Sequence, residues 1–272
     1  MKQVQFFVIA VAIFMGISFT SCLNTSDDNA QSTGAALATV ESSYMGIDYF
    51  FRLDTGEKLI PTAGINASAL DGVKRVFIIY TFDRIDEITA QALVSDPKER
   101  EYHVSITYAT NLEDEHNVAN LTAHDTTNPD DSLTTKYYAP IRSIDSLRIK
   151  DNYLTAWINY NMSGEKFHFF TLFRYQDDAL RAGKNGAPDT LDVYLGHNVN
   201  GDSYYNTTSK DLAYISIEYT PLYFKAFDLT SVIHNVSEDM NTSNLVLKVI
   251  ARQISTAYGN DTINVSYPVK YN

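Results

Sequence analysis

The chain has 272 residues with 33 acidic and 21 basic side chains, which gives a formal charge of −12. Such an acidic protein repels phosphate backbones, so the composition argues against nucleic-acid binding. The single cysteine excludes an intramolecular disulfide, so apolar cores alone must stabilise the fold, and the length suffices for one large or two small domains.

Residues 1–21 are predicted to be an export signal that ends before Cys22. The signal has a positive residue at Lys2 and an uncharged apolar run over residues 6–17, which is shorter than the roughly 20 residues of a membrane-spanning helix. The sequence "FTSC", residues 19–22, resembles the lipobox of bacterial lipoproteins, in which the cysteine thiol is joined to a diacylglycerol. We therefore expect a lipid anchor at Cys22, because two or three acyl chains hold a protein stably on a membrane. The alternative is an ordinary cleaved signal with a chance cysteine.

The mature chain is expected to begin with a flexible tether over residues 22–42. This stretch is rich in Ser, Thr, Asn, Asp and Ala and shows no periodicity. Removal of the signal takes away one basic residue, Lys2, and no acid, so 20 basic and 33 acidic side chains remain and the formal charge becomes −13.

The next part of the chain has the alternation and composition of β-strands. "DYFFRL" and "EKLIPT" flank a turn at residues 54–57 and predict a hairpin. "VKRVFIIYTF" is a continuous apolar run typical of a strand buried on both faces, and "EYHVSITYAT" alternates as a further strand. Residues 83–100 between them predict a short helix or an insertion loop.

Residues 111–138 form an acidic, polar stretch that predicts a long loop, and Pro140 follows it. We therefore place an N-terminal domain at residues 43–138 and a C-terminal domain at residues 139–272. In the latter, "NYLTAWINYN" and "KFHFFTLFRY" predict a hairpin around residues 162–165. Further strand-like runs follow without intervening helices, a pattern that favours an all-β fold with a C-terminal β-sandwich.

Several of these stretches together resemble the NigD-like lipoproteins of Bacteroidetes. The resemblance rests on the acidic tract after Cys22 and on "FFRLDTGEKLIP", "DGVKRVFIIYTF", "NYLTAWINYN", "KFHFFTLF" and "LDVYLGHNVNGD". It implies an N-terminal OB-like β-barrel followed by a β-sandwich. These stretches are structural signatures, and the family brings no established molecular function. Its name derives from a bacteriocin gene cluster, which points to an immunity or secretion role.

Candidate catalytic and metal sites have simpler structural explanations. "LDTGE" places Asp54 as an aspartic protease places its catalytic acid, but that chemistry needs a second carboxylate, and no second Asp-Thr-Gly or Asp-Ser-Gly exists in the chain. His116 and His124 lie in the acidic loop without defined ligand spacing. Residues 197–202, "HNVNGD", could bind calcium weakly, but a turn between strands is the simpler explanation. We expect no metal and no cofactor.

Tyrosines in predicted loops are the one binding signal. Tyrosine offers a flat apolar face with a polar hydroxyl, which suits sugars or protein partners. Four tyrosines fall in loops where packing does not demand them: Tyr137, Tyr138, Tyr204 and Tyr205. Asp-Thr and Asp-Ser pairs in the polar loop also resemble a bacterial O-glycosylation sequon, with Thr126 and Ser132 as the acceptors.

The sequence therefore predicts a non-enzymatic cell-envelope lipoprotein that acts as a binding module. No Gly-x-Ser-x-Gly motif and no phosphate-binding glycine loop is present. The expected partners are a membrane, through the lipid at Cys22, and an unidentified glycan or protein. The acidic tract "TSDDN" resembles surface-export signals, so we expect an outer-membrane location with exposure at the cell surface. The alternative is an immunity or envelope-assembly protein that binds a bacteriocin or a secretion component.

Overall fold

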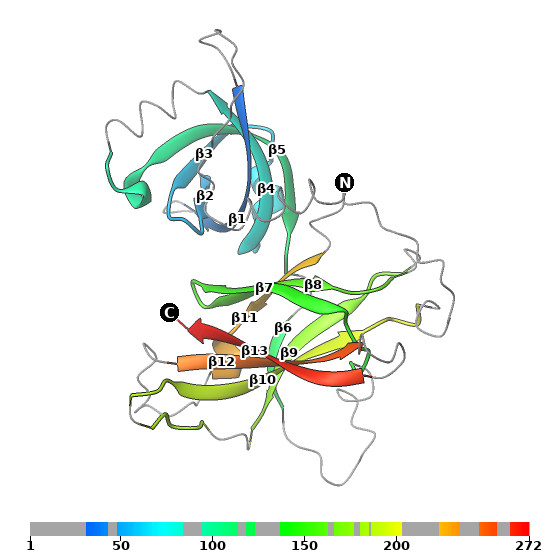
Figure 1. Ribbon diagram of the computed structural model, residues 1–272. Helices are drawn as coiled ribbons and strands as arrows, with labels where there is room; N and C mark the ends of the chain where they lie inside the picture. The colour runs from blue at the N-terminus through cyan, green and yellow to red at the C-terminus, as the bar shows by residue number, and fades with distance from the viewer. Residues whose placement is uncertain are drawn as a thin grey trace, which may run out of the picture. The chain divides into compact units, whose positions relative to one another are not determined.

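A computed structural model describes residues 31–42, 48–83, 94–113, 118–122, 137–162, 166–176, 180–184, 186–202, 223–233, 245–254 and 262–271 (Figure 1). The chain divides into two compact units, Met1–Asn111 and Leu112–Asn272. Both units are built from β-strands, as the alternation in the sequence predicts. In the part of the chain described above, no helix is long and apolar enough to cross a membrane.

The first unit is a closed five-stranded barrel. Its strands are β1 (Gln31–Ser42), β2 (Tyr49–Leu53), β3 (Lys58–Ala63), β4 (Arg75–Asp83) and β5 (Glu101–Asn111). They follow one another around the barrel as β1-β2-β3-β5-β4, and β4 closes against β1. All pairs are antiparallel except β3 with β5. This is the small Greek-key barrel expected for an OB-like domain.

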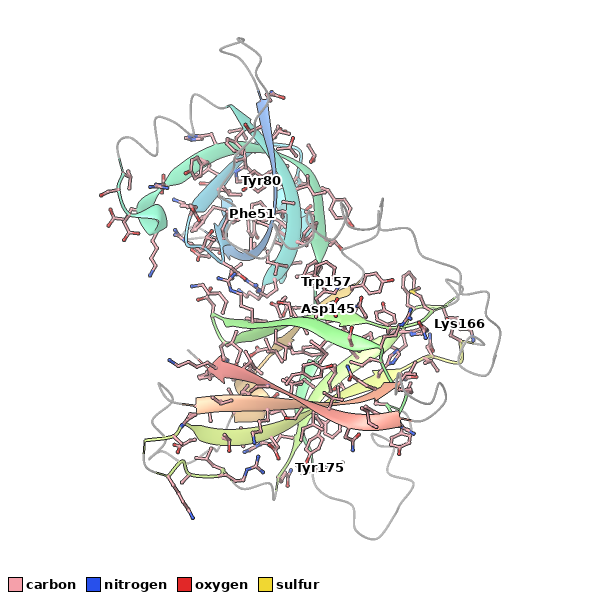
Figure 2. The ribbon with its side chains drawn as sticks, viewed as in Figure 1. Phe51, Tyr80, Asp145, Trp157, Lys166 and Tyr175 are labelled. Atoms are coloured by element: carbon pink, nitrogen blue, oxygen red, sulfur yellow. The ribbon has the colours of Figure 1, made fainter. Side chains whose placement is uncertain are left out.

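Alternating side chains fill the interior of this barrel. Phe51 and Tyr80 are buried in the centre, as Figure 2 shows. The Tyr80 ring lies so close to Gly34 that a Cβ on Gly34 would be 2.5 Å from its Cζ atom. Strand β1 therefore needs a residue without a side chain at this position, because the ring already occupies that space.

The hairpin predicted around residues 54–57 is confirmed. Leu53 N donates to Glu57 O, and Gly56, with φ +112°, donates its amide to Leu53 O. Two short 3₁₀ turns, η1 (Ala67–Leu70) and η2 (Pro97–Glu99), complete the described connections. Residues 84–93, where the sequence allows a short helix or an insertion loop, lie outside the described residues.

The second unit is a β-sandwich, as expected, with two sheets stacked face to face (Figure 1). The five-stranded sheet has the order β13-β12-β10-β9-β6 and the three-stranded sheet the order β11-β8-β7. The strands are β6 (Val118–Thr122), β7 (Ser143–Lys150), β8 (Tyr153–Asn159), β9 (Phe169–Tyr175), β10 (Asp189–Asn198), β11 (Phe224–Asp228), β12 (Leu245–Ile254) and β13 (Thr262–Tyr271). A single helical turn, α4 (Thr230–Ile233), follows β11.

Both sheets contribute one face to a common apolar core. Leu154 and Ile158 of β8 face Leu172 of β9 and the inward residues of β10 and β12 in this core. Polar contacts also join the sheets: the Tyr267 hydroxyl on β13 accepts a hydrogen bond from the Ile144 amide on β7, and Gln253 also bonds to that hydroxyl. Inward side chains therefore define the sandwich, as alternation on each strand predicts.

The predicted hairpin between "NYLTAWINYN" and "KFHFFTLFRY" is wrong. These runs form β8 and β9, but β8 pairs with β7 and β11, whereas β9 pairs with β10 and β6. The connection therefore crosses from one sheet to the other. Turn residues show that the chain reverses direction, but hydrogen-bond pairing depends on which strands meet in the fold.

Two predicted boundaries also need correction. Residues 31–42, assigned to the tether, form β1, because Val40 and Ala38 contribute to the barrel core. The two units meet at residues 111 and 112 rather than at 138 and 139. The polar stretch 111–138 contains β6, which pairs in parallel with β9 and so belongs to the sandwich.

Candidate functional site

The candidate site lies at one end of the sandwich, where residues 137–141 enter the five-stranded sheet. The β10–β12 ladder ends at Leu195 and Ala251. Beyond this point the segment lies between the two strands. It exchanges backbone hydrogen bonds with His197 of β10 (His197 N to Tyr137 O, 3.1 Å; Ala139 N to His197 O, 3.0 Å) and with β12 through Ile141.

Gly196 allows this segment to lie close to β10. A Cβ on Gly196 would be 2.7 Å from the Cβ of Tyr137, which is shorter than a normal contact. Tyr137 is therefore packed against the sheet and half-buried, as tyrosines near a sheet often are. Of the predicted pair, Tyr138 is the residue left at the surface.

Tyr138 is 59% exposed, and Arg252 of β12 contacts both its ring and its backbone. The Arg252 guanidinium carbon lies 3.6 Å from the centroid of the Tyr138 ring, and Nη1 donates a 3.0 Å hydrogen bond to the Tyr138 carbonyl oxygen. A cation over the ring and a bond to its backbone together fix an exposed aromatic side chain. We call Tyr138 with Arg252 the tyrosine platform.

A second exposed aromatic residue lies at the same end of β10. Phe167 is 74% exposed and comes just before β9, whose Phe169 pairs with Asn198. Its neighbour Lys166, labelled in Figure 2, donates to Gly201 O (3.4 Å) in the turn after β10. Aromatic and basic side chains therefore occur together here in a protein whose overall charge is negative.

A chain of buried polar side chains lies inside the sandwich at this end. His197 Nδ1 is 3.2 Å from the carbonyl oxygen of Pro140, and His197 Nε2 is 2.9 Å from His168 Nδ1. His168 Nε2 is in turn 3.0 Å from Asp202 Oδ2. All four residues are buried. We call them the histidine chain.

The turn after β10 aims the Asp202 carboxylate into the interior. Asn200 and Gly201 have φ values of +53° and +72°, and Asp202 N donates to Val199 O (2.8 Å). Asn and Gly adopt this left-handed conformation most readily, so the "NVNGD" sequence favours the tight turn. The turn expected at residues 197–202 is thus confirmed.

Aromatic rings and one lysine surround the two histidines. His197 stacks on Phe170 with 4.6 Å between ring centroids, and Tyr160 packs edge-on against it at 5.4 Å. Lys225 of β11 points into the same region, with Nζ 5.7 Å from the Phe170 centroid. The pKa of His197 is lowered from 6.5 to about 3, chiefly by burial; the neighbouring His168 and Lys225 also contribute to this lowering, whereas the Pro140 contact opposes it. Burial also lowers the pKa of His168, against the influence of Asp202.

The geometry of the histidine chain does not suit a metal ion. His168 uses Nδ1 for His197 and Nε2 for Asp202, so these three side chains cannot converge on one centre. Within the residues that the structure describes, no group of three or more His, Cys, Asp and Glu side chains could hold a metal. His116 and His124 lie outside the described residues.

Asp54, the residue considered as a protease acid, binds a buried arginine. Arg75 donates from Nη1 to Asp54 Oδ1 (2.8 Å) and from Nη2 to Oδ2 (3.1 Å), and it also donates to the Thr39 hydroxyl (2.9 Å). A bidentate arginine contact stabilises the ionised carboxylate. Asp54 therefore links the turn at residues 54–57 to β4. This structural role explains its position without protease chemistry.

Several predicted site residues lie outside the described residues and stay predictions: Cys22, Thr126, Ser132, Tyr204 and Tyr205. Tyr137 and Tyr138 occur together at the sandwich end, although only Tyr138 is exposed. The histidine chain was missed, because its members come from separate stretches of sequence. The position of His168 in an apolar run was the available signal.

Comparison with solved structures shows the same fold in two proteins of Bacteroides. A predicted lipoprotein of Bacteroides fragilis has a TM-score of 0.57 and 17% identity, covering 89% of this chain and 99% of its own. A NigD-like immunity protein of Bacteroides caccae has a TM-score of 0.51 and 16% identity, covering 89% of this chain and 98% of its own. No protein-family model and no curated protein matches the sequence. The resemblance to NigD-like lipoproteins is thus confirmed for the fold.

Proposed function

We propose that this protein is a lipid-anchored binding module of the cell envelope without catalytic activity. The observation that carries the binding role is the tyrosine platform, in which Arg252 fixes an exposed Tyr138 ring. A ring already held in place loses little conformational entropy when a ligand binds. Its flat face and hydroxyl suit a sugar ring or an apolar protein side chain.

Binding is tested with matched tyrosine variants on an immobilised glycan array. Tyr138→Ala removes the platform, whereas Tyr108→Ala removes an exposed tyrosine on the barrel and serves as the control. We expect glycan binding in the native protein and in Tyr108→Ala, and at least about tenfold weaker binding in Tyr138→Ala, which corresponds to ~1.4 kcal/mol. Equal binding by both variants would refute the role of the platform.

The membrane location rests on Cys22 at the end of the export signal. The likeness in fold to a predicted lipoprotein supports this proposal. We propose that the lipid holds the protein in the outer membrane, with the domains facing the cell surface. Cys22→Ala should move the protein from the membrane to the soluble fraction, and protease treatment of intact cells should degrade the native protein. A Cys22→Ala variant that stays firmly on the membrane would overturn the anchor.

A second candidate is an immunity or envelope-assembly role with a protein as the ligand. The observation that favours it is the shared fold with a NigD-like immunity protein. Chemical crosslinking in intact cells followed by purification tests this role. A bacteriocin or secretion component recovered with the native protein and with Tyr108→Ala, but lost with Tyr138→Ala, would favour this candidate over a glycan.

We also propose O-glycosylation at Thr126 and Ser132 in the polar loop. Periodate-sensitive staining of the purified native protein should disappear in the Thr126→Ala/Ser132→Ala double variant. An unchanged mass and unchanged staining would contradict this modification.

A further inference from the structure

The histidine chain is attached to the segment that carries the tyrosine platform. His197 holds residues 137–139 through two backbone hydrogen bonds, and its ring faces the carbonyl oxygen of Pro140. Tyr138 lies within this span. Any change at the His197 ring therefore acts on the backbone two residues from Tyr138.

The protons of the histidine chain can be assigned from its two ends. The Asp202 carboxylate only accepts, so His168 donates Nε2–H to it, because two lone pairs facing each other beside a full negative charge would be more costly. An uncharged His168 then accepts at Nδ1 from His197 Nε2–H. An uncharged His197 consequently presents a lone pair at Nδ1 to the Pro140 oxygen, which also only accepts. That contact is the longest of the three, at 3.2 Å against 2.9 and 3.0 Å.

A further proton on the histidine chain, beyond the one N–H just assigned to each ring, would have two opposed effects. It would complete the hydrogen bond to Pro140, but it would also place a positive charge among buried groups. Asp202 favours a positive charge on His168, whereas Lys225 disfavours one on either ring. Among the described residues, two further titratable groups lie near this region: Tyr160, just after β8, and Tyr223, just before β11 and near Arg142. The pKa of Tyr223 is raised by burial.

Burial is the larger of the two effects. The pKa of His197 is about 3 in the folded protein, although the Pro140 contact raises it. The pKa of His168 is also lowered, although Asp202 raises it. Protons therefore bind these rings more weakly in the closed sandwich than in water, and by linkage their uptake favours any state in which the rings reach water.

We propose that Pro140, His197, His168 and Asp202 form an acid-sensitive latch, which holds residues 137–141 in the sheet while both histidines are uncharged and releases them when a proton is taken up. The latch controls the position of the tyrosine platform. Its effect on ligand binding rests on the proposed function, whereas the release of residues 137–141 does not. Acidification then removes Tyr138 from its place over Arg252. The latch is closed at neutral pH.

Hydrogen–deuterium exchange of the full chain, without any ligand, tests the latch. The probe is the peptide covering residues 137–141, measured from pH 7 to about pH 4.5 and corrected for the intrinsic exchange rate. We expect at least about tenfold lower protection at the acidic end, because the opened rings gain protons below pH 6.5. Protection that stays constant or rises on acidification would overturn the latch.

Variants separate the latch from general acid sensitivity. His168→Gln/His197→Gln keeps polar side chains but cannot take up a proton, so its protection at residues 137–141 should no longer depend on pH. His103→Gln on the barrel, where His103 is exposed, is the matched control and should retain the native profile. An equal acid-induced loss in the double variant and in the native protein would contradict the proposal.

Two further measurements keep the test decisive. If the double variant does not fold, NMR titration of the native protein should show the rings of His168 and His197 titrating below 6.5, and titration at or above 6.5 would overturn the latch. Glycan binding by Tyr138 is measured separately at pH 7 and at about pH 4.5. If Tyr138-dependent glycan binding is equal at both pH values, the latch is refuted but the binding role is not. If no glycan binds while hydrogen–deuterium exchange still depends on pH, the binding role is refuted but the latch is not.

Discussion

Replacing Asp54 with alanine would leave the buried Arg75, at the start of β4, without the carboxylate that it binds. Arg75 is 0% exposed and the Asp54 side chain 4% exposed, and their contact is bidentate at 2.8 and 3.1 Å. Loss of one partner from a buried ion pair costs about 3–5 kcal/mol, because the remaining charge stays buried. The Thr39 hydroxyl still accepts one bond from Arg75, so we expect about 3 kcal/mol, the lower end of this range.

Urea unfolding measures this loss with two signals. Trp157 is the sole tryptophan and lies in the sandwich, so its fluorescence reports on that unit, whereas circular dichroism reports on both. We expect Asp54→Ala to move the circular dichroism transition to lower urea and to leave the Trp157 transition in place. Glu101→Gln is the control, since Glu101 and Lys58 form a surface pair at 2.7 Å that should contribute less than about 1 kcal/mol. A cost below about 1 kcal/mol for Asp54→Ala would refute the reasoning.

Three other outcomes follow from single sites. The pKa of His197 is about 3 in the folded protein and 6.5 in water, so the unfolded chain binds more protons between these two pH values. The free energy of unfolding of the sandwich should therefore fall as the pH drops from 6.5 towards 3. The expected loss is up to about 5 kcal/mol, measured by urea unfolding with Trp157 fluorescence. Gly64→Ala should cost about 2–4 kcal/mol by circular dichroism, because φ is +92° and a Cβ would lie 1.8 Å from Ile106 O. Leu172→Ala, at a fully buried position between the sheets, should cost about 2–5 kcal/mol in the Trp157 transition. A flat pH profile, or a cost below about 1 kcal/mol in either variant, would contradict the respective argument.

Alternation along each strand was sufficient to locate most of the fold. Leu154, Ala156, Ile158 and Tyr160 share one phase, and all four lie in the core of the sandwich. Strand pairing was not predictable in the same way, because it depends on residues distant in sequence. The β8–β9 prediction failed for this reason, and β6 was missed because it is a short strand within a polar stretch.

The tyrosine platform could be predicted only in part. Loop position singled out Tyr137 and Tyr138, but it did not distinguish Tyr137, whose Cβ lies close to Gly196, from Tyr138, whose exposed ring is contacted by Arg252. That distinction depends on residues 137–141 entering the sheet between β10 and β12, which brings Arg252 to Tyr138 from more than a hundred positions away. No local pattern carries this information.

The burial of the two histidines could be predicted from their positions in the alternation along each strand. His168 is in phase with the buried Phe170 and Leu172, whereas His103 alternates with the buried Val104 and Ile106 and is exposed. A histidine in phase with a core must be buried, and a buried imidazole needs hydrogen-bond partners. His197 continues the phase of the buried residues of β10 in the same way, so each histidine needs a buried hydrogen-bond partner, but only the structure shows that they bond to each other. The lowered pKa of both follows from this burial.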